Sequence, residues 1–469
     1  MKRVHAFTDD VLGDLDAVGV ARAVEAGEFS AREATDAAVD RIDRVNPQLA
    51  AVAYDDRERA RVRAAENGFS GAFAGVPTLI KNNTDYAGLP TRQGSAAVAD
   101  RPAAANEPFT EEFLGAGVNV VGASTMPAFG LTATTEFADR EPTRNPWDTD
   151  YSCGASSGGA AALVAAGAVP IAHANDGGGS IRIPAAACGL VGLKPTRGRT
   201  AGSPASAKAP IDLVCNGIVS RSVRDTAYFL ADLERQRRLD TLDPVGLVEG
   251  PSTARLRVAL MAEPITGVPL DADTRRAVDD VVALLTGLGH HVEEAPLPVD
   301  PSFVGQFTDY WGTLALSFDR FGGQVVGPGF DRNRLDPFTK GLARMALRRF
   351  YRIPASIVGL RRAVAKFRNA FGSYDVILTP TLGHTTPEIG YLDPAGRFDE
   401  VFERLIQYVA FTPADNACGT PAISLPLGQA SNGLPIGIHF SADRGAERTL
   451  LSLAFELEAA APFARIQDA

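Results

Sequence analysis

The sequence predicts an α/β fold in which a mixed β-sheet core is flanked by helices on both faces. Short apolar runs typical of buried strands alternate along the chain with segments whose apolar residues recur at helical spacing. The 469 residues, 45% hydrophobic and 22% charged, suffice for a large core. Because no repeat or linker-like tract interrupts the chain, we expect a single domain over residues 1–469.

Residues 1–70 are expected to be mainly helical. Apolar side chains recur at helical spacing over 16–28 and 30–45, and the second segment begins with the capping-box pattern of Ser30 and Glu33. Pro47 is expected just beyond the end of that helix. Up to residue 174, strands are predicted at 75–80, 118–123 and 169–174. One helix is predicted to begin near Thr110 and another to span 157–168.

The second half continues the alternation. Its predicted elements are strands at 256–260, 291–293, 374–380 and 421–426, a helix at 273–288 and an aromatic-rich helical segment at 303–351. We expect this helical region, about 300–370, to be the variable part of the domain and to cover a binding cleft. An ordinary packed helical layer explains the same aromatic residues.

Charge and composition narrow the class of protein. A formal net charge of −10 argues against nucleic acid as a partner. The longest apolar stretch, 160–172, contains Gly167 and Pro170 and falls short of the roughly 20 residues that a membrane span needs. The amino terminus has no apolar core of a signal peptide, so we expect a cytoplasmic protein without a membrane partner. The locally basic region 332–368 suggests solvated helix faces, or a rim for an acidic substrate or partner.

Two serines set among glycines, Ser156 and Ser180, suggest acyl-transfer chemistry. Glycine allows close approach to the backbone, so the turn at 177–180 can aim several N–H groups at one point, as an oxyanion hole requires. A phosphate loop ending in Gly-Lys-Ser/Thr is excluded, because that sequence does not occur. A purely structural glycine-rich turn remains an alternative.

Lys81, at the end of an apolar strand, is a candidate base. The chain has 6 lysines and 40 arginines, so it uses arginine wherever a fixed positive charge suffices. Arginine keeps its proton in a protein, whereas a desolvated lysine can lose it. A lysine reaching the surface from a strand end is the alternative.

No histidine in the sequence is a clear candidate for the base of an ordinary serine hydrolase. Residues 154–158 match the Gly-x-Ser-x-Gly pattern of a nucleophile elbow, but the preceding 145–150 is turn-like where such an elbow needs a strand. His384 and His439 are candidate bases for that alternative, although a structural role explains each. His173 is expected to be a hydrogen-bonded core histidine.

Several long motifs resemble the amidase signature hydrolases. The resemblance is strong over about 72–225 and 375–440 and weak over about 230–370. The motifs that carry it are 75–81, 143–147, 154–159, 176–185, 192–196, 220–225 and 419–426. Two segments depart from the family pattern: Gly-Ala-Ser-Ser at 154–157 and Gly-Ala-Ser-Thr at 122–125.

The resemblance implies the amidase signature fold and a Ser-cisSer-Lys triad. Ser180 is the implied nucleophile, Ser156 the bridging serine on a cis peptide, and Lys81 the neutral base. The backbone N–H groups of Gly177, Gly178, Gly179 and Ser180 form the implied oxyanion hole, and neither a metal nor a cofactor is required. Thr125, Met126, Phe129 and Cys418 are expected to line the substrate pocket.

Within the family, the segments 173–176, 386–390 and 410–413 are most similar to the 6-aminohexanoate cyclic dimer hydrolases and to bacterial acylamidases. The implied substrate is a small linear or cyclic amide or an anilide, with nylon oligomers and carbamates as further candidates. The sequence is compatible with a homodimer but does not predict one. The alternatives are a glutamyl-tRNA amidotransferase A-type subunit, a Ser-His esterase of the α/β-hydrolase type, and a binding protein with an inactive site.

Overall fold

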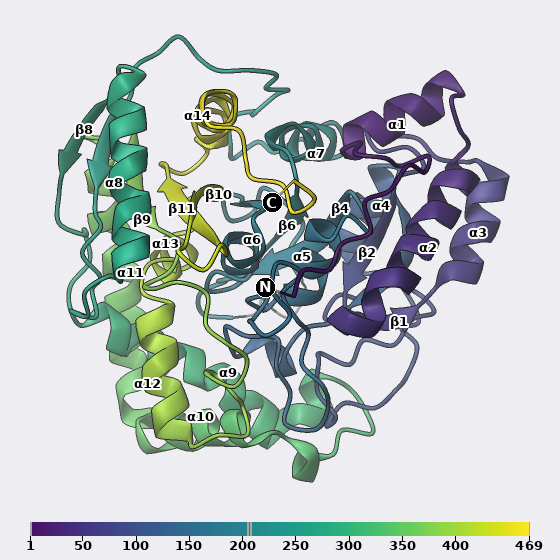
Figure 1. Cartoon of the computed structure of the whole chain (residues 1–469). Coiled ribbons are helices and arrows are strands. Elements are labelled where there is room, and N and C mark those ends of the chain that lie inside the picture. Colours follow the sequence, from purple (N-terminus) through teal and green to yellow (C-terminus); the bar gives the residue numbers. More distant parts are fainter. Residues whose placement is uncertain (1, 204–205, 207–208, 469) are drawn as a thin grey trace.

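A mixed eight-stranded sheet runs through the computed structural model, which describes residues 2–203, 206 and 209–468 (Figure 1). In spatial order its strands are β4 (Ile171–Asp176), β6 (Cys215–Ser220), β5 (Val191–Lys194), β10 (Ala422–Gln429), β11 (Pro435–Ser441), β9 (Val376–Pro380), β7 (Arg257–Leu260) and β8 (His291–Glu294). Neighbours from β4 to β9 are antiparallel, whereas β9, β7 and β8 are parallel. The predicted mixed sheet is confirmed.

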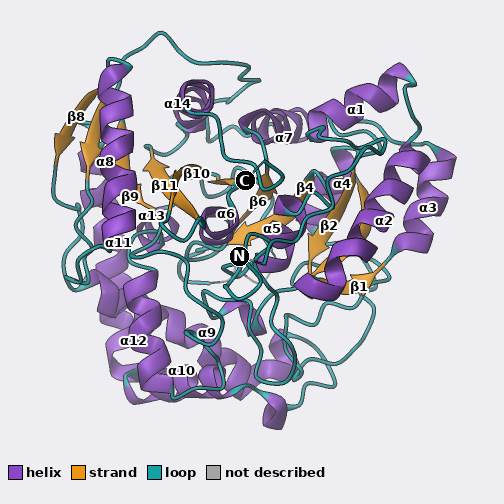
Figure 2. Ribbon diagram, in the orientation of Figure 1, coloured by secondary structure: helices purple, strands orange, loops and turns teal. Residues whose placement is uncertain are grey.

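Helices cover both faces of this sheet (Figure 2). On β11, Gly437 lies against Ala186 of α6, while the adjacent Ile436 lies beside Gly428, which contacts Ala277 of α8. Neighbouring strand residues point to opposite faces, so α6 and α8 lie on opposite sides. The helices that pack against the sheet are α5 (Gly158–Ala165), α6 (Arg182–Cys188), α7 (Val223–Gln236), α8 (Ala272–Gly287) and α14 (Glu447–Ala460), while α13 (Pro413–Cys418) packs against α11 (Ile353–Ala370).

A separate three-stranded sheet holds the strand that ends at Lys81. Its order is β1 (Val52–Asp55), β3 (Asn119–Ser124) and β2 (Pro77–Lys81). The end of β2 lies against β4 of the main sheet, because Thr78 Oγ1 donates to the Ile171 carbonyl at 2.9 Å and the Lys81 N–H donates to His173 Nδ1 at 3.1 Å. Neither β1 nor this division into two sheets was predicted from the sequence.

The amino-terminal helices are α1 (Ala17–Ala26), α2 (Ala31–Leu49) and α3 (Arg57–Glu66), followed later by α4 (Pro108–Gly115). Ser30 and Glu33 form the predicted capping box. The expectation that Pro47 follows the end of the helix is wrong, since α2 continues through it to Leu49. Burial of the Val45 and Leu49 side chains explains the extra turn.

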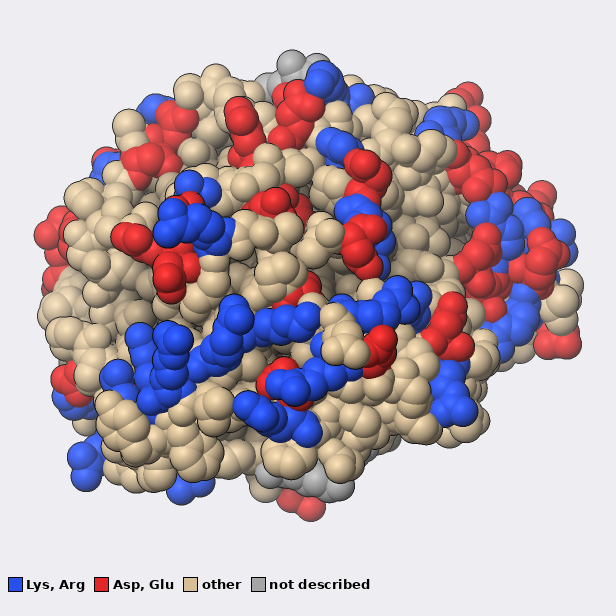
Figure 3. Space-filling model, turned by 90° about the horizontal axis from the view of Figure 1, so that it is seen from below, with Lys and Arg blue, Asp and Glu red and all other residues tan. Residues whose placement is uncertain are grey.

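Residues 303–370 and 398–408 make a helical layer, and most of it lies at the bottom of the molecule in Figure 1. Its elements are α9 (Phe303–Val325), η3 (Arg332–Arg334), α10 (Pro337–Arg348), η4 (Phe350–Arg352), α11 (Ile353–Ala370) and α12 (Phe398–Tyr408). A band of Lys and Arg side chains crosses the face that this layer presents (Figure 3). Several basic groups of 332–368 are ion-paired: Arg352 lies 3.2 Å from Asp309, and Lys366 lies 2.7 Å from Asp300.

Among the described residues, no helix combines the length and the apolar character needed to cross a membrane.

Candidate active site

Lys81 and Ser156 meet in the interior, next to the point where the two sheets touch. The Nζ of Lys81 lies 2.8 Å from Ser156 Oγ, and the Lys81 side chain has no exposed surface. The peptide bond between Ala155 and Ser156 is cis. Gly130 leaves room for the serine hydroxyl, because a Cβ at that position would lie 3.0 Å from Ser156 Oγ, and its φ is +67°.

Burial lowers the pKa of Lys81 to about 7, although the negative charge of Asp176 partly opposes the shift. No salt bridge joins Nζ to a carboxylate in the described chain. A large fraction of the amine is therefore neutral near neutral pH, as a proton acceptor must be. The alternative of a surface-reaching lysine does not fit this geometry.

Ser180 lies in the turn between β4 and α6, and one carboxylate shapes that turn. The Oδ1 of Asp176 accepts the Gly179 N–H at 2.7 Å, and Oδ2 accepts the Ile181 N–H at 3.1 Å. Ser157 Oγ donates to the Ser180 carbonyl at 2.6 Å and fixes the other side of the turn. The expectation that the Gly179 N–H is an oxyanion-hole donor is corrected, because this N–H already donates to Asp176.

Ser156 and Ser180 both line one cavity of about 180 Å³. Its apolar walls come from the 129–133 segment, from α9 through Phe307, Trp311 and Leu314, and from α12 through Leu405 and Ile406. Of the residues that the structure describes, no Asp, Glu, Lys, Arg or His lines this cavity. The cavity therefore offers the hydroxyl groups of Ser156 and Ser180, together with backbone N–H groups, within an uncharged, mainly apolar surface.

The four residues expected to line the substrate pocket lie in different places. Phe129 lines the cavity and stacks on Phe318 of α9, with ring centroids 4.1 Å apart. Thr125, Met126 and Cys418 are buried outside that lining. Thr125 Oγ1 is 2.7 Å from Thr143 Oγ1, and Cys418 packs in a hydrophobic cluster with α9 and α11. Of these four residues, only Phe129 is therefore placed where it can contact a substrate in this cavity.

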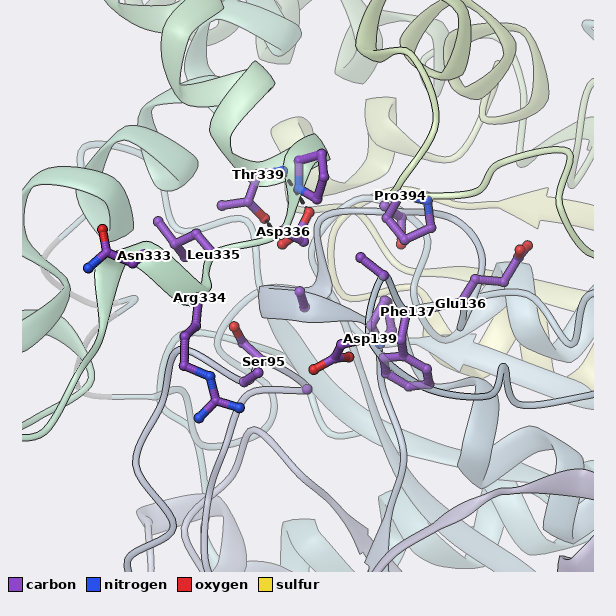
Figure 4. A pocket seen from close by; sticks show the side chains of 17 residues that line it. Ser95, Glu136, Phe137, Asp139, Asn333, Arg334, Leu335, Asp336, Thr339 and Pro394 are labelled. Carbon is purple, nitrogen blue, oxygen red and sulfur yellow. Dashed lines mark hydrogen bonds between the residues drawn. The ribbon is translucent and has the colours of Figure 1, made fainter.

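A second cavity of about 180 Å³ is lined by Pro127, Ala128 and Thr132 and by residues of 333–339 (Figure 4). Its lining includes Glu136, Asp139, Arg334 and Asp336, and Asp336 accepts hydrogen bonds from Thr339. The two cavities share Thr132. Neither Ser156 nor Ser180 lines the second cavity. The candidate reaction site is therefore the first cavity, whose lining is uncharged.

The histidines are engaged elsewhere. His173 Nδ1 accepts the Lys81 N–H, so its proton is on Nε2, which lies 3.4 Å from Asn216 Oδ1; burial lowers its pKa to about 3. His439 Nε2 lies 2.9 Å from Arg182 Nη1, and His384 Nδ1 donates to the Thr385 carbonyl at 2.8 Å. In the described chain no histidine bonds to either serine, which removes the support for the Ser-His esterase.

The structure places around the two serines several polar residues for which the sequence predicted no role. Asn175 and Asn83 line the cavity, and Asn175 Oδ1 accepts from Lys81 Nζ at 2.7 Å. Arg182 and Asn416 hold the Asp176 carboxylate from below, with Arg182 Nε 2.9 Å from Oδ2 and Asn416 Nδ2 2.8 Å from Oδ1. The Asn-Asp-Gly-Gly-Gly sequence at 175–179 was the available indication, because aspartate before glycines favours a side-chain-capped turn.

The fold and the family relationships below define an amide-hydrolysing enzyme. The family model for Amidase matches residues 33–451, so the chain belongs to the amidase signature family. It is 48% identical over 468 residues to a Mycobacterium leprae (strain TN) protein with the provisional name amidase AmiC, covering 100% of this chain and 99% of that one.

Several solved structures share the fold, among them the following two. A 6-aminohexanoate cyclic dimer hydrolase complexed with substrate is 31% identical, with a TM-score of 0.88 over 97% of this chain and 98% of that one. A bacterial aryl acylamidase of the amidase signature family is 26% identical, with a TM-score of 0.85 over 97% of this chain and 98% of that one.

Proposed function

We propose that this enzyme hydrolyses uncharged linear or cyclic amides and anilides through an acyl-serine intermediate on Ser180. The observation that carries the proposal is the buried contact of 2.8 Å between Lys81 Nζ and Ser156 Oγ, beside the cavity that Ser180 also lines. Its likeness to a cyclic dimer hydrolase and to an aryl acylamidase supports the two kinds of substrate.

The reaction begins when Ser180 Oγ attacks the carbonyl carbon of the amide. The Ser180 proton passes to Ser156 Oγ as the proton of Ser156 passes to the neutral Lys81 Nζ. The backbone N–H groups of Gly177, Gly178 and Ser180 stabilise the oxyanion of the tetrahedral intermediate. Gly179 is left out of this set because its N–H donates to Asp176.

The C–N bond then breaks, and Lys81 returns its proton through Ser156 to the leaving amine. Water attacks the acyl-serine by the same relay in reverse, which releases the acid and restores Ser180. Every proton taken by Lys81 is returned within a half-reaction, so the scheme needs neither a metal nor a cofactor.

The charge-free lining of the cavity supports an uncharged substrate. An ammonium or carboxylate buried there without a partner loses its hydration without compensation. Cyclic amides, anilides and carbamates carry no such charge, whereas linear nylon oligomers end in charged groups. Cyclic oligomers therefore fit the cavity better than linear ones.

Matched 4-nitroanilides test both the activity and the selectivity. We expect the isolated chain to release nitroaniline from the hexanoyl anilide, and kcat/KM to be about 10²-fold lower for the 5-carboxypentanoyl and 6-aminohexanoyl anilides, owing to the unpaired buried charge. Equal kcat/KM values for the three substrates would contradict the proposed selectivity. Absence of activity on all three would favour an amidotransferase subunit that needs partner chains.

A further inference from the structure

The amine of Lys81 has one strong hydrogen-bond acceptor besides the serine. Asn175 Oδ1 lies 2.7 Å from Nζ, while the Asn175 carbonyl oxygen lies 3.5 Å away. Asn175 is on β4 and is itself buried, with 7% of its surface exposed. The side chain that faces the amine is thus a neutral amide, and aspartate is the charged side chain of nearly the same shape.

A neutral primary amine has two N–H donors and one lone pair. Asn175 Oδ1 takes one hydrogen, and the second faces the more distant Asn175 carbonyl oxygen. The remaining direction is that of Ser156 Oγ at 2.8 Å, so the lone pair points to the hydroxyl whose proton it must take. An ammonium in the same place has three hydrogens, but among the described residues only two acceptors lie closer than 3 Å to it.

A second asparagine fixes which way the Asn175 amide faces. Asn175 Nδ2 donates to Asn83 Oδ1 at 3.1 Å, and Asn83 Nδ2 lies 3.3 Å from Asn175 Oδ1. Asn83 follows Lys81 by two residues, just after the end of β2. The pair therefore ties the ends of β2 and β4 together and turns the amide oxygen of Asn175 to the amine.

We propose that Asn175 is a positioning residue that aims the lone pair of Lys81 at Ser156 and, because it is uncharged, lets the amine give up its proton. The inference rests on the proposed role of Lys81 as the base. A carboxylate at the same place would form an ion pair with the ammonium and hold the proton on it.

Few other charges face the amine. Of the elements packed on β2, neither β3 nor α5 carries a titratable side chain, and the one buried charge of α2, Arg41, pairs with Asp10. β4 brings His173, which is kept neutral by burial, and Asp176, whose oxygens bind the turn and Arg182. A charge introduced at residue 175 would thus be the dominant new influence on Lys81.

The test is the pH profile of kcat/KM for the hexanoyl anilide with Asn175→Asp and Asn175→Leu. We expect Asn175→Asp to move the acid limb to higher pH by about one unit or more, with activity recovering at high pH. Asn175→Leu should leave the limb at or below its wild-type pH and lower the plateau about 10-fold, because the amine loses its acceptor. If Asn175 had only a structural role, the two substitutions would not be expected to shift the acid limb in opposite directions.

Asn333→Asp, at an exposed asparagine, is the control for adding a carboxylate and should leave the profile unchanged. Melting temperatures identify any variant that fails to fold, and either folded variant suffices for a decision. If Lys81 proves essential but Asn175→Asp keeps the wild-type limb, or Asn175→Leu keeps the wild-type plateau, the inference on Asn175 is wrong. Full activity of a Lys81 variant would instead overturn the proposed function itself.

Discussion

Replacing Lys81 with methionine should lower kcat/KM for a neutral anilide about 10³-fold at pH 8 and abolish the acid limb of the pH profile. Burial places the pKa of Lys81 at about 7, and only the neutral amine accepts a proton. Wild-type activity should therefore rise from pH 6 to pH 8, in about the range where this pKa lies. The measurement is a set of initial rates between pH 5 and 10, with buffer effects removed.

Lys340→Met is the control, since the Lys340 side chain binds the Asn333 carbonyl at the surface and does not line the reaction cavity. It should keep both the rate and the limb of the wild-type enzyme. A Lys81→Met enzyme with a wild-type rate, or a wild-type rate that stays constant down to pH 5, would show that Lys81 is not the base.

Replacing Asp176 with asparagine should lower the free energy of unfolding by about 3 kcal/mol or more. Asp176 and Arg182 are both fully buried, and their contact of 2.9 Å is a charge pair with no access to solvent. Asparagine removes the negative charge while Arg182 stays charged, with Asp415 at 3.3 Å as its remaining carboxylate. Urea-induced unfolding followed by circular dichroism measures the difference.

Asp375→Asn is the matched control, because Asp375 pairs with Arg257 at 2.8 Å on the surface. An exposed pair of this kind contributes about 1 kcal/mol or less. If Asp176→Asn were no more destabilising than Asp375→Asn, the buried carboxylate would not be what holds the turn around Ser180.

The parts of the site that lie within one continuous segment could be predicted from the sequence. Ser156, Ser180 and the glycines between 177 and 179 belong to one run, and the end of the strand at Lys81 was visible from its apolar pattern. The long motifs also identified the family, which the family match confirms. The roles of the three triad residues remain proposals.

Other parts depend on contacts between distant segments, which a local pattern does not encode. The apolar run at 75–80 indicated burial, but not that its strand joins a separate sheet with β1 and β3. Thr125 and Met126 are close in sequence to Phe129, yet of the three only Phe129 lines the cavity. Similarly, the Gly179 N–H is taken by a side chain whose position follows from Arg182 and Asn416 beneath it.

The most direct test of the account is to label the enzyme with a fluorophosphonate and locate the modified residue by peptide mass spectrometry. We expect one label, on Ser180, with labelling lost in Lys81→Met and kept in Lys340→Met. A label on Ser156 would contradict the assignment of the nucleophile, and an active enzyme that acquires no label would contradict the acyl-serine mechanism.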